Sequence, residues 1–181
     1  MLHFIYTQPL SRVIIAMAIA IAIWGYARTK LYGKRWNIAN ALLACGMVMA
    51  ILCITIMGRT TGERILVLKP FASLAAARTQ SEAYRELLMN IFLFFPFGLT
   101  LSNALPQSWG RWRRIGLTVI TGLLLSAGIE YIQYRFALGV AETDDVICNT
   151  LGTFIGSTSL LIAHGIEKYN EKTIKHDSNK N

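Results

Sequence analysis

The hydrophobic positions of the chain fall into long runs that contain no charged residue. Three of these runs, Trp36–Gly58, Leu87–Gly110 and Val146–Ile166, contain 23, 24 and 21 residues. A helix needs about 20 apolar residues to cross the hydrocarbon core of a bilayer. Each of the three runs is therefore long enough to form a transmembrane helix.

Two shorter uncharged runs, Val13–Ala27 and Ile115–Ile129, contain 15 residues each. Arg12, Arg28 and Arg114 border them, and long basic side chains at such positions can reach the membrane surface and lengthen a span. A soluble helical domain with a large core is disfavoured, because three separate runs pass the length test. We therefore predict an all-α membrane helix bundle with about five transmembrane helices, at residues 12–28, 37–57, 87–105, 115–134 and 145–164.

The charged residues of the chain predict how this helix bundle is oriented in the membrane. The formal net charge is +8, and just 15% of the residues are charged, where a soluble domain has about a quarter. The flanks on the side of the N-terminus carry 7 Lys and Arg residues and the opposite flanks carry 11. The positive-inside rule then places the N-terminus outside and the C-terminus in the cytoplasm. We expect no nucleic-acid partner.

The chain has one predicted domain, a transmembrane unit at residues 1–166 followed by a polar cytoplasmic tail at 167–181, whose end we expect to be disordered. An alternative is that the first apolar run is a cleavable signal peptide. Cleavage would leave the four bases of residues 28–37 outside, against the charge rule, so a first membrane span is favoured. The histidines and cysteines have no metal-ligand spacing, and we expect no metal ion and no cofactor.

Most of the acids that interrupt the apolar sequence gather between the last two predicted spans. The stretch "GIEYIQYRFALGVAETDDVICNTLG" contains Glu130, Glu142, Asp144 and Asp145 with one base, Arg135. In the predicted topology the third and fifth helices begin on the outer side and the fourth ends there. We therefore predict a polar mouth near the outer face, built from Asn90, Glu130, Gln133, Glu142, Asp144, Asp145 and Asn149.

The last two predicted helices each carry small residues and polar residues on a single face. These faces are Asp145, Asn149, Gly152 and Gly156 on the fifth helix, and Gly122, Ser126, Glu130 and Gln133 on the fourth. We predict that the two faces pack together, with Glu130 and Gln133 opposite Asp145 and Asn149. The alternatives are that the aspartates only cap their helix, that Asn149 only joins two helices, and that Glu130 only forms a salt bridge.

Two further segments have local features. Pro96 removes a backbone donor from the third predicted helix and Gly98 tolerates distortion, so we predict a kink there. The stretch "LVLKPFASL" in the long loop between the second and third helices predicts an extracellular interfacial or re-entrant segment. Arg59, Arg64 and Lys69 of this loop are the nearest bases for an anionic ligand, and Arg135 is another candidate.

At these residues the chain resembles the VanZ-like membrane proteins of bacteria. The resemblance rests on "NIFLFFPFG" (90–98), "SAGIEYIQ" (126–133), "VAETDDVICNTLGTFIG" (140–156) and the "L..PF.S" pattern that ends at Ser73. It implies a set of signature positions, namely Asn90, Pro96, Gly98, Glu130, Gln133, Glu142, Asp145, Asn149 and Gly152. Many relatives place an arginine just before the third segment, where this chain has Gly139.

The resemblance implies a function in the bacterial envelope, with localisation in the cytoplasmic membrane and a connection to resistance against the glycopeptide teicoplanin. We expect the polar mouth to bind or modify a lipid-linked cell-wall precursor or a glycopeptide, with membrane lipids as further partners. Glu130 and Asp145 would then be an acid–base pair. Because no nucleophile stands out, binding is favoured over catalysis. The alternatives are a small transporter, and a regulatory or scaffold subunit that contacts a partner through Gly122–Ser126 and Gly152–Gly156.

Overall fold

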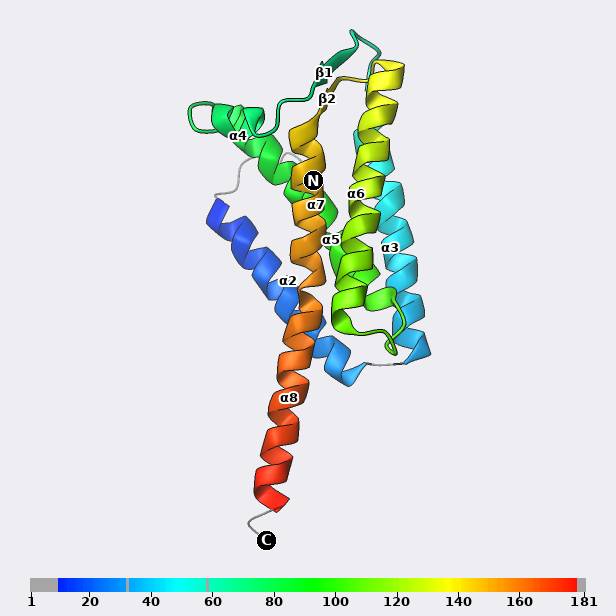
Figure 1. Ribbon diagram of the computed structural model, residues 1–181, viewed down its shortest axis with the longest axis vertical. Helices are drawn as coiled ribbons and strands as arrows, with labels where there is room; N and C mark the ends of the chain where they lie inside the picture. Colours follow the sequence, from blue (N-terminus) through cyan, green and yellow to red (C-terminus); the bar gives the residue numbers. More distant parts are fainter. Residues whose placement is uncertain (1–9, 32, 58, 179–181) are drawn as a thin grey trace.

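The computed structural model describes residues 10–31, 33–57 and 59–178, with the side chains described up to residue 173. This part of the chain is mostly helical (Figure 1). Five helices are long and apolar enough to cross a membrane, which confirms the predicted fold class. They are α2 (Leu10–Lys30), α3 (Lys34–Thr55), α5 (Ser81–Ala104), α6 (Arg111–Phe136), and α7 (Thr143–Ser157), which continues beyond Thr158 as α8 (Ser159–Ser178).

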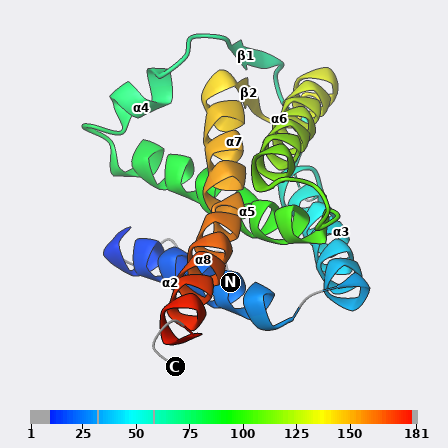
Figure 2. The same cartoon turned by 60° about the horizontal axis from the view of Figure 1, so that its bottom comes forward.

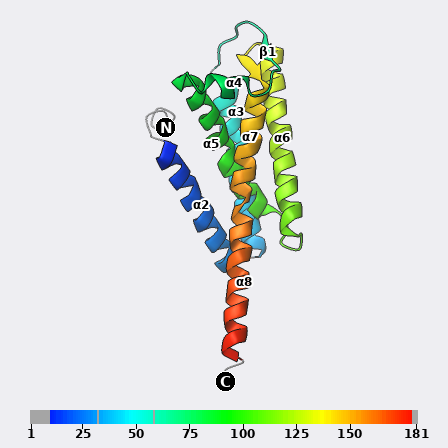
Figure 3. The same ribbon diagram turned by 60° about the vertical axis from the view of Figure 1, so that its left-hand side comes forward.

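The helices alternate in direction, so the bundle has two distinct ends (Figures 1 and 3). We call one of them the loop end. There α3 and α6 finish, at Thr55 and Phe136, and α5 and α7 begin, at Ser81 and Thr143. The other, the turn end, holds the α2–α3 and α5–α6 connections. Figure 2 shows α7 in the middle of the assembly, with α5 crossing beside it.

The C-terminal helix is longer than the predicted span. We expected disorder at the end of the polar tail, but α8 continues to Ser178, so this expectation is wrong for residues 170–178. Residues 179–181 lie outside the described part. The physical reason is that lysine and glutamate, which make this stretch polar, are also good helix formers. Helix α8 therefore extends past the turn end of the bundle (Figure 3).

The apolar packing is divided between two clusters. Ile51, Phe94, Phe97 and Ile129 join α3, α5 and α6, while Met17, Phe95 and Leu99 join α2 to α5. In a membrane, helices gain little from burying apolar surface, so close packing and hydrogen bonds between helices matter more. Helix α2 makes one close contact and one hydrogen bond of this kind. A Cβ on Gly25 would lie 2.9 Å from a methyl carbon of Ile162 in α8. Trp24 Nε1 donates to Asn40 Oδ1 of α3 at 2.8 Å.

Glycines allow α5 and α7 to approach until their backbones touch. A Cβ added to Gly98 would lie 2.7 Å from the Cα of Thr153, and one added to Gly152 would lie 2.9 Å from the carbonyl carbon of Ile91. Gly98 was predicted to tolerate a distortion at Pro96. Gly98 serves this close approach, α5 is helical across Pro96, and the kink at Pro96 stays a prediction.

The small residues of α7 therefore do not face the helix that we predicted. A Cβ on Gly156 would meet the backbone of Phe95 and Leu99, so Gly152 and Gly156 both pack on α5 and not on α6. The scaffold alternative assigned this pair to a partner protein. In the described part of the chain these two glycines are already covered by α5.

The long loop lies across the loop end of the bundle and does not pass between the helices as a re-entrant segment would (Figures 1 and 3). It contains a strand, β1 (Ile65–Val67), and a short helix, α4 (Ala72–Ala76). Strand β1 pairs in parallel with β2 (Val140–Glu142), with Ile65 opposite Val140 and Val67 opposite Glu142. Two segments that are far apart in sequence are thus joined above the ends of the helices.

Candidate functional site

A cavity of about 470 Å³ lies at the loop end, between α3, α5, β2 and the start of α7. Its polar lining consists of Thr55, Arg59, Ser73, Glu86, Asn90, Glu142 and Asp145. Its apolar lining consists of Ile54, Leu87, Met89, Leu93 and Val140. The structure therefore brings four of the predicted site residues, Arg59, Asn90, Glu142 and Asp145, to one cavity.

Asp145 and Asn90 connect the two helices that form the wall of this cavity. Asn90 Nδ2 donates to Asp145 Oδ1 at 2.6 Å. Asp145 is in the first turn of α7, where the positive end of the helix dipole stabilises a carboxylate. A carboxylate has about four acceptor sites, so Asp145 can accept further hydrogen bonds from a ligand.

Glu142 and Glu130 form a second set of contacts at the loop end. Ser73 Oγ donates to Glu142 Oε2 at 2.7 Å, and the Glu142 backbone N–H donates to Glu130 Oε2 at 3.0 Å. Glu130 is buried and is not among the residues that line the cavity. Glu130 holds strand β2 and Asp145 lines the cavity, and the predicted pairing of these two carboxylates in one pocket stays a prediction.

The polar residues of α6 face two different helices. Asn149 Nδ2 of α7 donates to Ser126 Oγ at 2.8 Å, and a Cβ on Gly122 would lie 2.9 Å from the Cβ of Thr153, so this part of α6 faces α7 as predicted. Gln133 was expected to face α7 as well. Its Nε2 donates to the backbone oxygen of Thr55 at 3.0 Å and thereby satisfies the last residue of α3.

Asp144 fastens the long loop to the bundle. It is 4% exposed, and its two oxygens accept hydrogen bonds from the backbone N–H groups of Phe71 at 2.5 Å and Ser73 at 2.7 Å. Phe71 has a left-handed backbone (φ 64°), which turns both N–H groups toward the carboxylate. We predicted Asp144 as a ligand-binding residue, but its hydrogen-bonding capacity is used within the protein.

Arg59 supplies the positive charge of the cavity. Its Nη1 donates to the backbone oxygen of Leu138 at 3.3 Å and lies so close to Gly139 that a Cβ there would be 2.6 Å away. Gly139 also has φ 130°, a conformation that favours glycine. Arg59 thus occupies the space beside Gly139, the position where the resemblance to the VanZ-like proteins implies an arginine. Arg135 is exposed, lies 5.8 Å from the ring centre of Phe136, and does not line the cavity.

Three polar residues of the cavity were not among the predicted site residues. Glu86 lies one helical turn before Asn90 on the same face of α5, so helical spacing could have identified it. Thr55 and Ser73 gave no comparable signal, because their positions depend on where α3 ends and on how the loop folds. With Glu86 included, three carboxylates and one guanidinium line the cavity.

This lining determines what the cavity can bind. The carboxylates accept hydrogen bonds from hydroxyl, amide or ammonium groups, while Arg59 offers donors to an anionic group. In the described part of the chain, no group of three or more His, Cys, Asp and Glu residues is arranged to hold a metal ion.

Comparisons with known proteins agree with this architecture. Residues 14–164 match the model of the VanZ/LLP1 family. The chain is similar to Protein VanZ of Enterococcus faecium, with 36% identity over 94 residues, which are 52% of this chain. The chain spans about half the length of that relative, 51%. No solved structure matches significantly. Because the family model covers most of the chain, including every residue of the cavity lining, this multi-pass membrane protein belongs to the VanZ/LLP1 family.

Proposed function

We propose that the chain binds the polar part of an envelope amphiphile in the cavity at the loop end. One observation carries the proposal: carboxylates and a guanidinium line a cavity of about 470 Å³ together with apolar side chains, among helices long enough to span a membrane. Ligand pockets typically measure about 300–1,000 Å³, and those for amphiphiles combine apolar walls with a few polar groups. The volume suits a sugar or a short peptide and not a whole lipid-linked molecule.

The ligand class follows from the charges. Asp145, Glu142 and Glu86 suit a group that is rich in hydroxyl, amide or amine donors, and Arg59 suits one acidic group on the same molecule. A lipid-linked cell-wall precursor and a glycopeptide such as teicoplanin both carry this combination of groups. Leu87, Met89 and Leu93 would contact the adjoining apolar part.

We propose binding and not catalysis as the main activity. The acid–base pair expected from the sequence needs Glu130 and Asp145 at one reacting centre. Glu130 instead holds the backbone of Glu142, outside the cavity lining. The carboxylates that share the cavity with Asp145 are Glu142, which Ser73 holds, and Glu86. Neither is the partner expected from the sequence, so binding is the activity that the lining supports best.

The proposed cellular role is a contribution to teicoplanin resistance, with the cavity open to the outer face of the bacterial cytoplasmic membrane. The distribution of Lys and Arg favours this orientation, and membership of the VanZ/LLP1 family supports the proposed role. A ligand held at the outer face would be in the compartment where a glycopeptide meets its target.

The decisive experiment replaces Asp145 by asparagine. Asp145→Asn keeps an oxygen for Asn90 Nδ2 but removes the charge, so the helix pair stays joined while the cavity loses its central acceptor. We expect the wild-type chain to confer teicoplanin resistance on a susceptible host and the variant to lose it, with equal protein levels in the membrane. Native mass spectrometry should show loss of any co-purified glycolipid.

The matched control is Glu63→Gln, which removes the same charge from an exposed position of the loop. It should leave both resistance and bound lipid unchanged. Full resistance in the Asp145→Asn variant, at the wild-type protein level, would refute the proposed function.

A further inference from the structure

The turn end of the bundle contains a second, basic cavity that the proposed function does not use. It measures about 170 Å³, and its charged and polar lining includes Arg28, Gln107, Arg111, Arg114, His164 and Glu167. Three guanidinium groups thus stand against one carboxylate. The excess of positive charge is the reverse of that in the cavity at the loop end.

Arg114 distinguishes this cavity from a group of exposed basic residues on the surface, because it is buried and fixed by a hydrogen bond. Its side chain is 3% exposed, and Nη2 donates to the backbone oxygen of Ser102 at 2.6 Å. Its Nε is buried and has no hydrogen-bond partner among the residues that the structure describes. A buried N–H of a charged group without an acceptor is costly, so an acceptor in the adjoining cavity would stabilise it.

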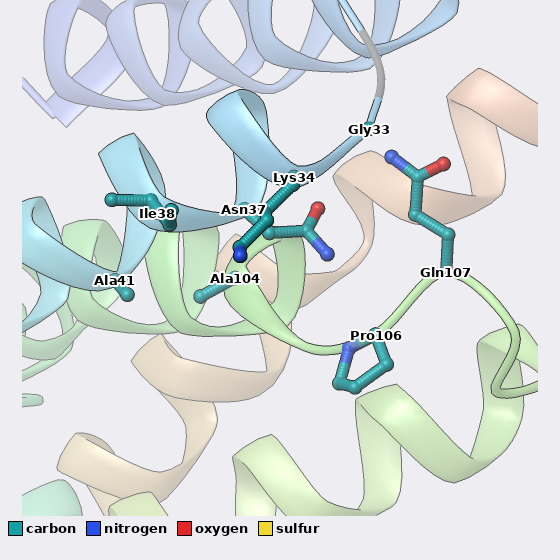
Figure 4. A pocket seen from close by; sticks show the side chains of 8 residues that line it. All are labelled: Gly33, Lys34, Asn37, Ile38, Ala41, Ala104, Pro106 and Gln107. Atoms are coloured by element: carbon teal, nitrogen blue, oxygen red, sulfur yellow. The ribbon is translucent and has the colours of Figure 1, made fainter.

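Gln107 connects the basic cavity to an apolar hollow of about 410 Å³. With its amide oxygen turned toward them, Gln107 accepts hydrogen bonds from Arg28 Nη1 at 3.1 Å and Gly33 N at 3.0 Å. Figure 4 shows the hollow, with Ile38 and Ala41 from α3 on one side and Gln107 on the other. A polar compartment and an apolar one are therefore adjacent.

We propose that this end of the bundle binds an anionic phospholipid, with its phosphate in the basic cavity and part of an acyl chain in the apolar hollow. Guanidinium groups match the oxygens of a phosphate with paired donors. Helix α6 begins at Arg111, so the positive end of its dipole points to the same place. Basic pockets between transmembrane helices bind anionic head groups in this way.

The lipid is favoured over free phosphate because the two compartments are adjacent and share Gln107 in their linings. A free phosphate would use only the arginines and leave the hollow empty. A phospholipid fills both, and it is present at high concentration around helices that cross a bilayer. A zwitterionic lipid would bring its cation into a cavity that already has an excess of positive charge.

The test measures binding of fluorescent phosphatidylglycerol and phosphatidylcholine to the detergent-purified full chain. We expect phosphatidylglycerol to bind at least about tenfold more tightly. Arg111→Gln should weaken it about tenfold, since a charge-assisted contact is lost. Glu167→Gln should tighten it, because a competing anion is removed. A purely structural role of these residues would not produce opposite signs.

Arg35→Gln is the control, since Arg35 is an exposed base at the same end that lines neither cavity. It should leave binding unchanged. The apolar hollow is tested with Ala41→Phe, which fills it. This substitution should weaken the binding of phosphatidylglycerol but not the binding of the headgroup analogue glycerol phosphate. Equal binding of the two lipids, or no effect of Arg111→Gln, overturns the proposal. The proposal is also overturned if glycerol phosphate binds as tightly as the lipid and Ala41→Phe does not weaken lipid binding.

Discussion

The contact between Asp144 and the long loop leads to a quantitative prediction about the loop's opening. The carboxylate accepts two backbone N–H groups, from Phe71 and Ser73, and it is almost completely buried. A hydrogen bond to a charged group contributes about 1.5–3 kcal/mol. Asp144→Asn keeps one oxygen acceptor but turns an NH₂ group toward the other N–H, so we expect the loop to lose about 2–3 kcal/mol of its attachment.

That loss can be measured directly at the two amides. Since 1.4 kcal/mol corresponds to a factor of ten, hydrogen exchange of the Phe71 and Ser73 amides should accelerate about 30- to 100-fold. Peptides that cover residues 65–80, analysed by mass spectrometry of the protein in detergent, give the assay. Peptides from the middle of α5 and α6 should be unchanged.

The control for this prediction is Glu63→Gln, an exposed loop carboxylate whose removal should not alter exchange. Because Ser73 also donates to Glu142, opening of the loop should loosen that contact and weaken any ligand of the cavity. Unaltered exchange at Phe71 and Ser73 in the Asp144→Asn variant would show that the carboxylate does not hold the loop.

Two further predictions concern packing between helices. Gly98→Ala should destabilise the protein by about 1–3 kcal/mol, since the new methyl group meets backbone that cannot move aside. Gly128→Ala is the control and should have little effect, because Gly128 has open space around it. Thermal unfolding in detergent measures the stability of both variants. The hydrogen bond between Asn149 and Ser126 should give a coupling of about 0.6 kcal/mol in a double-mutant cycle of alanine variants. Equal stability of the two glycine variants, or a coupling near zero, would contradict the packing described.

The sequence was sufficient for the membrane helices because their signal is local. A run of 20 uncharged residues needs no knowledge of its neighbours, and the five predicted spans correspond to helices in the structure. The helix ends were less well defined. Helix α5 begins at Ser81, six residues before the apolar run, because polar residues also form helix where they leave the hydrocarbon.

Pairing between helices was only partly predictable. Helical spacing correctly placed Gly152 and Gly156 on one face of α7, but it cannot say which neighbour that face meets. The face covers α5, while Asn149, one step around, reaches α6. The choice depends on how five helices pack together, and that is not encoded in the periodicity of any one of them.

The contacts of the site residues were also only partly predictable. Asn90 and Asp145 could be placed at one level because both lie near the start of a predicted span, 87–105 or 145–164, at the same end, and the structure joins them. The roles of Asp144 and Arg59 depend on contacts between the long loop and residues that are 71 to 79 positions away in the sequence. Turn chemistry of this kind has no periodic signal, so sequence reasoning could name these side chains but not their contacts.

The parallel pairing of β1 with β2 has a consequence for how the protein is made. Residues 65–67 leave the ribosome long before residues 140–142, and Asp144 follows later still. While α5 and α6 are being inserted into the membrane, the earlier segment therefore has neither its partner strand nor its anchor. A nascent chain arrested before Thr143 would contain four of the five spans but would lack Asp144 and Asp145. The cavity at the loop end is therefore complete only after the last helix has been inserted.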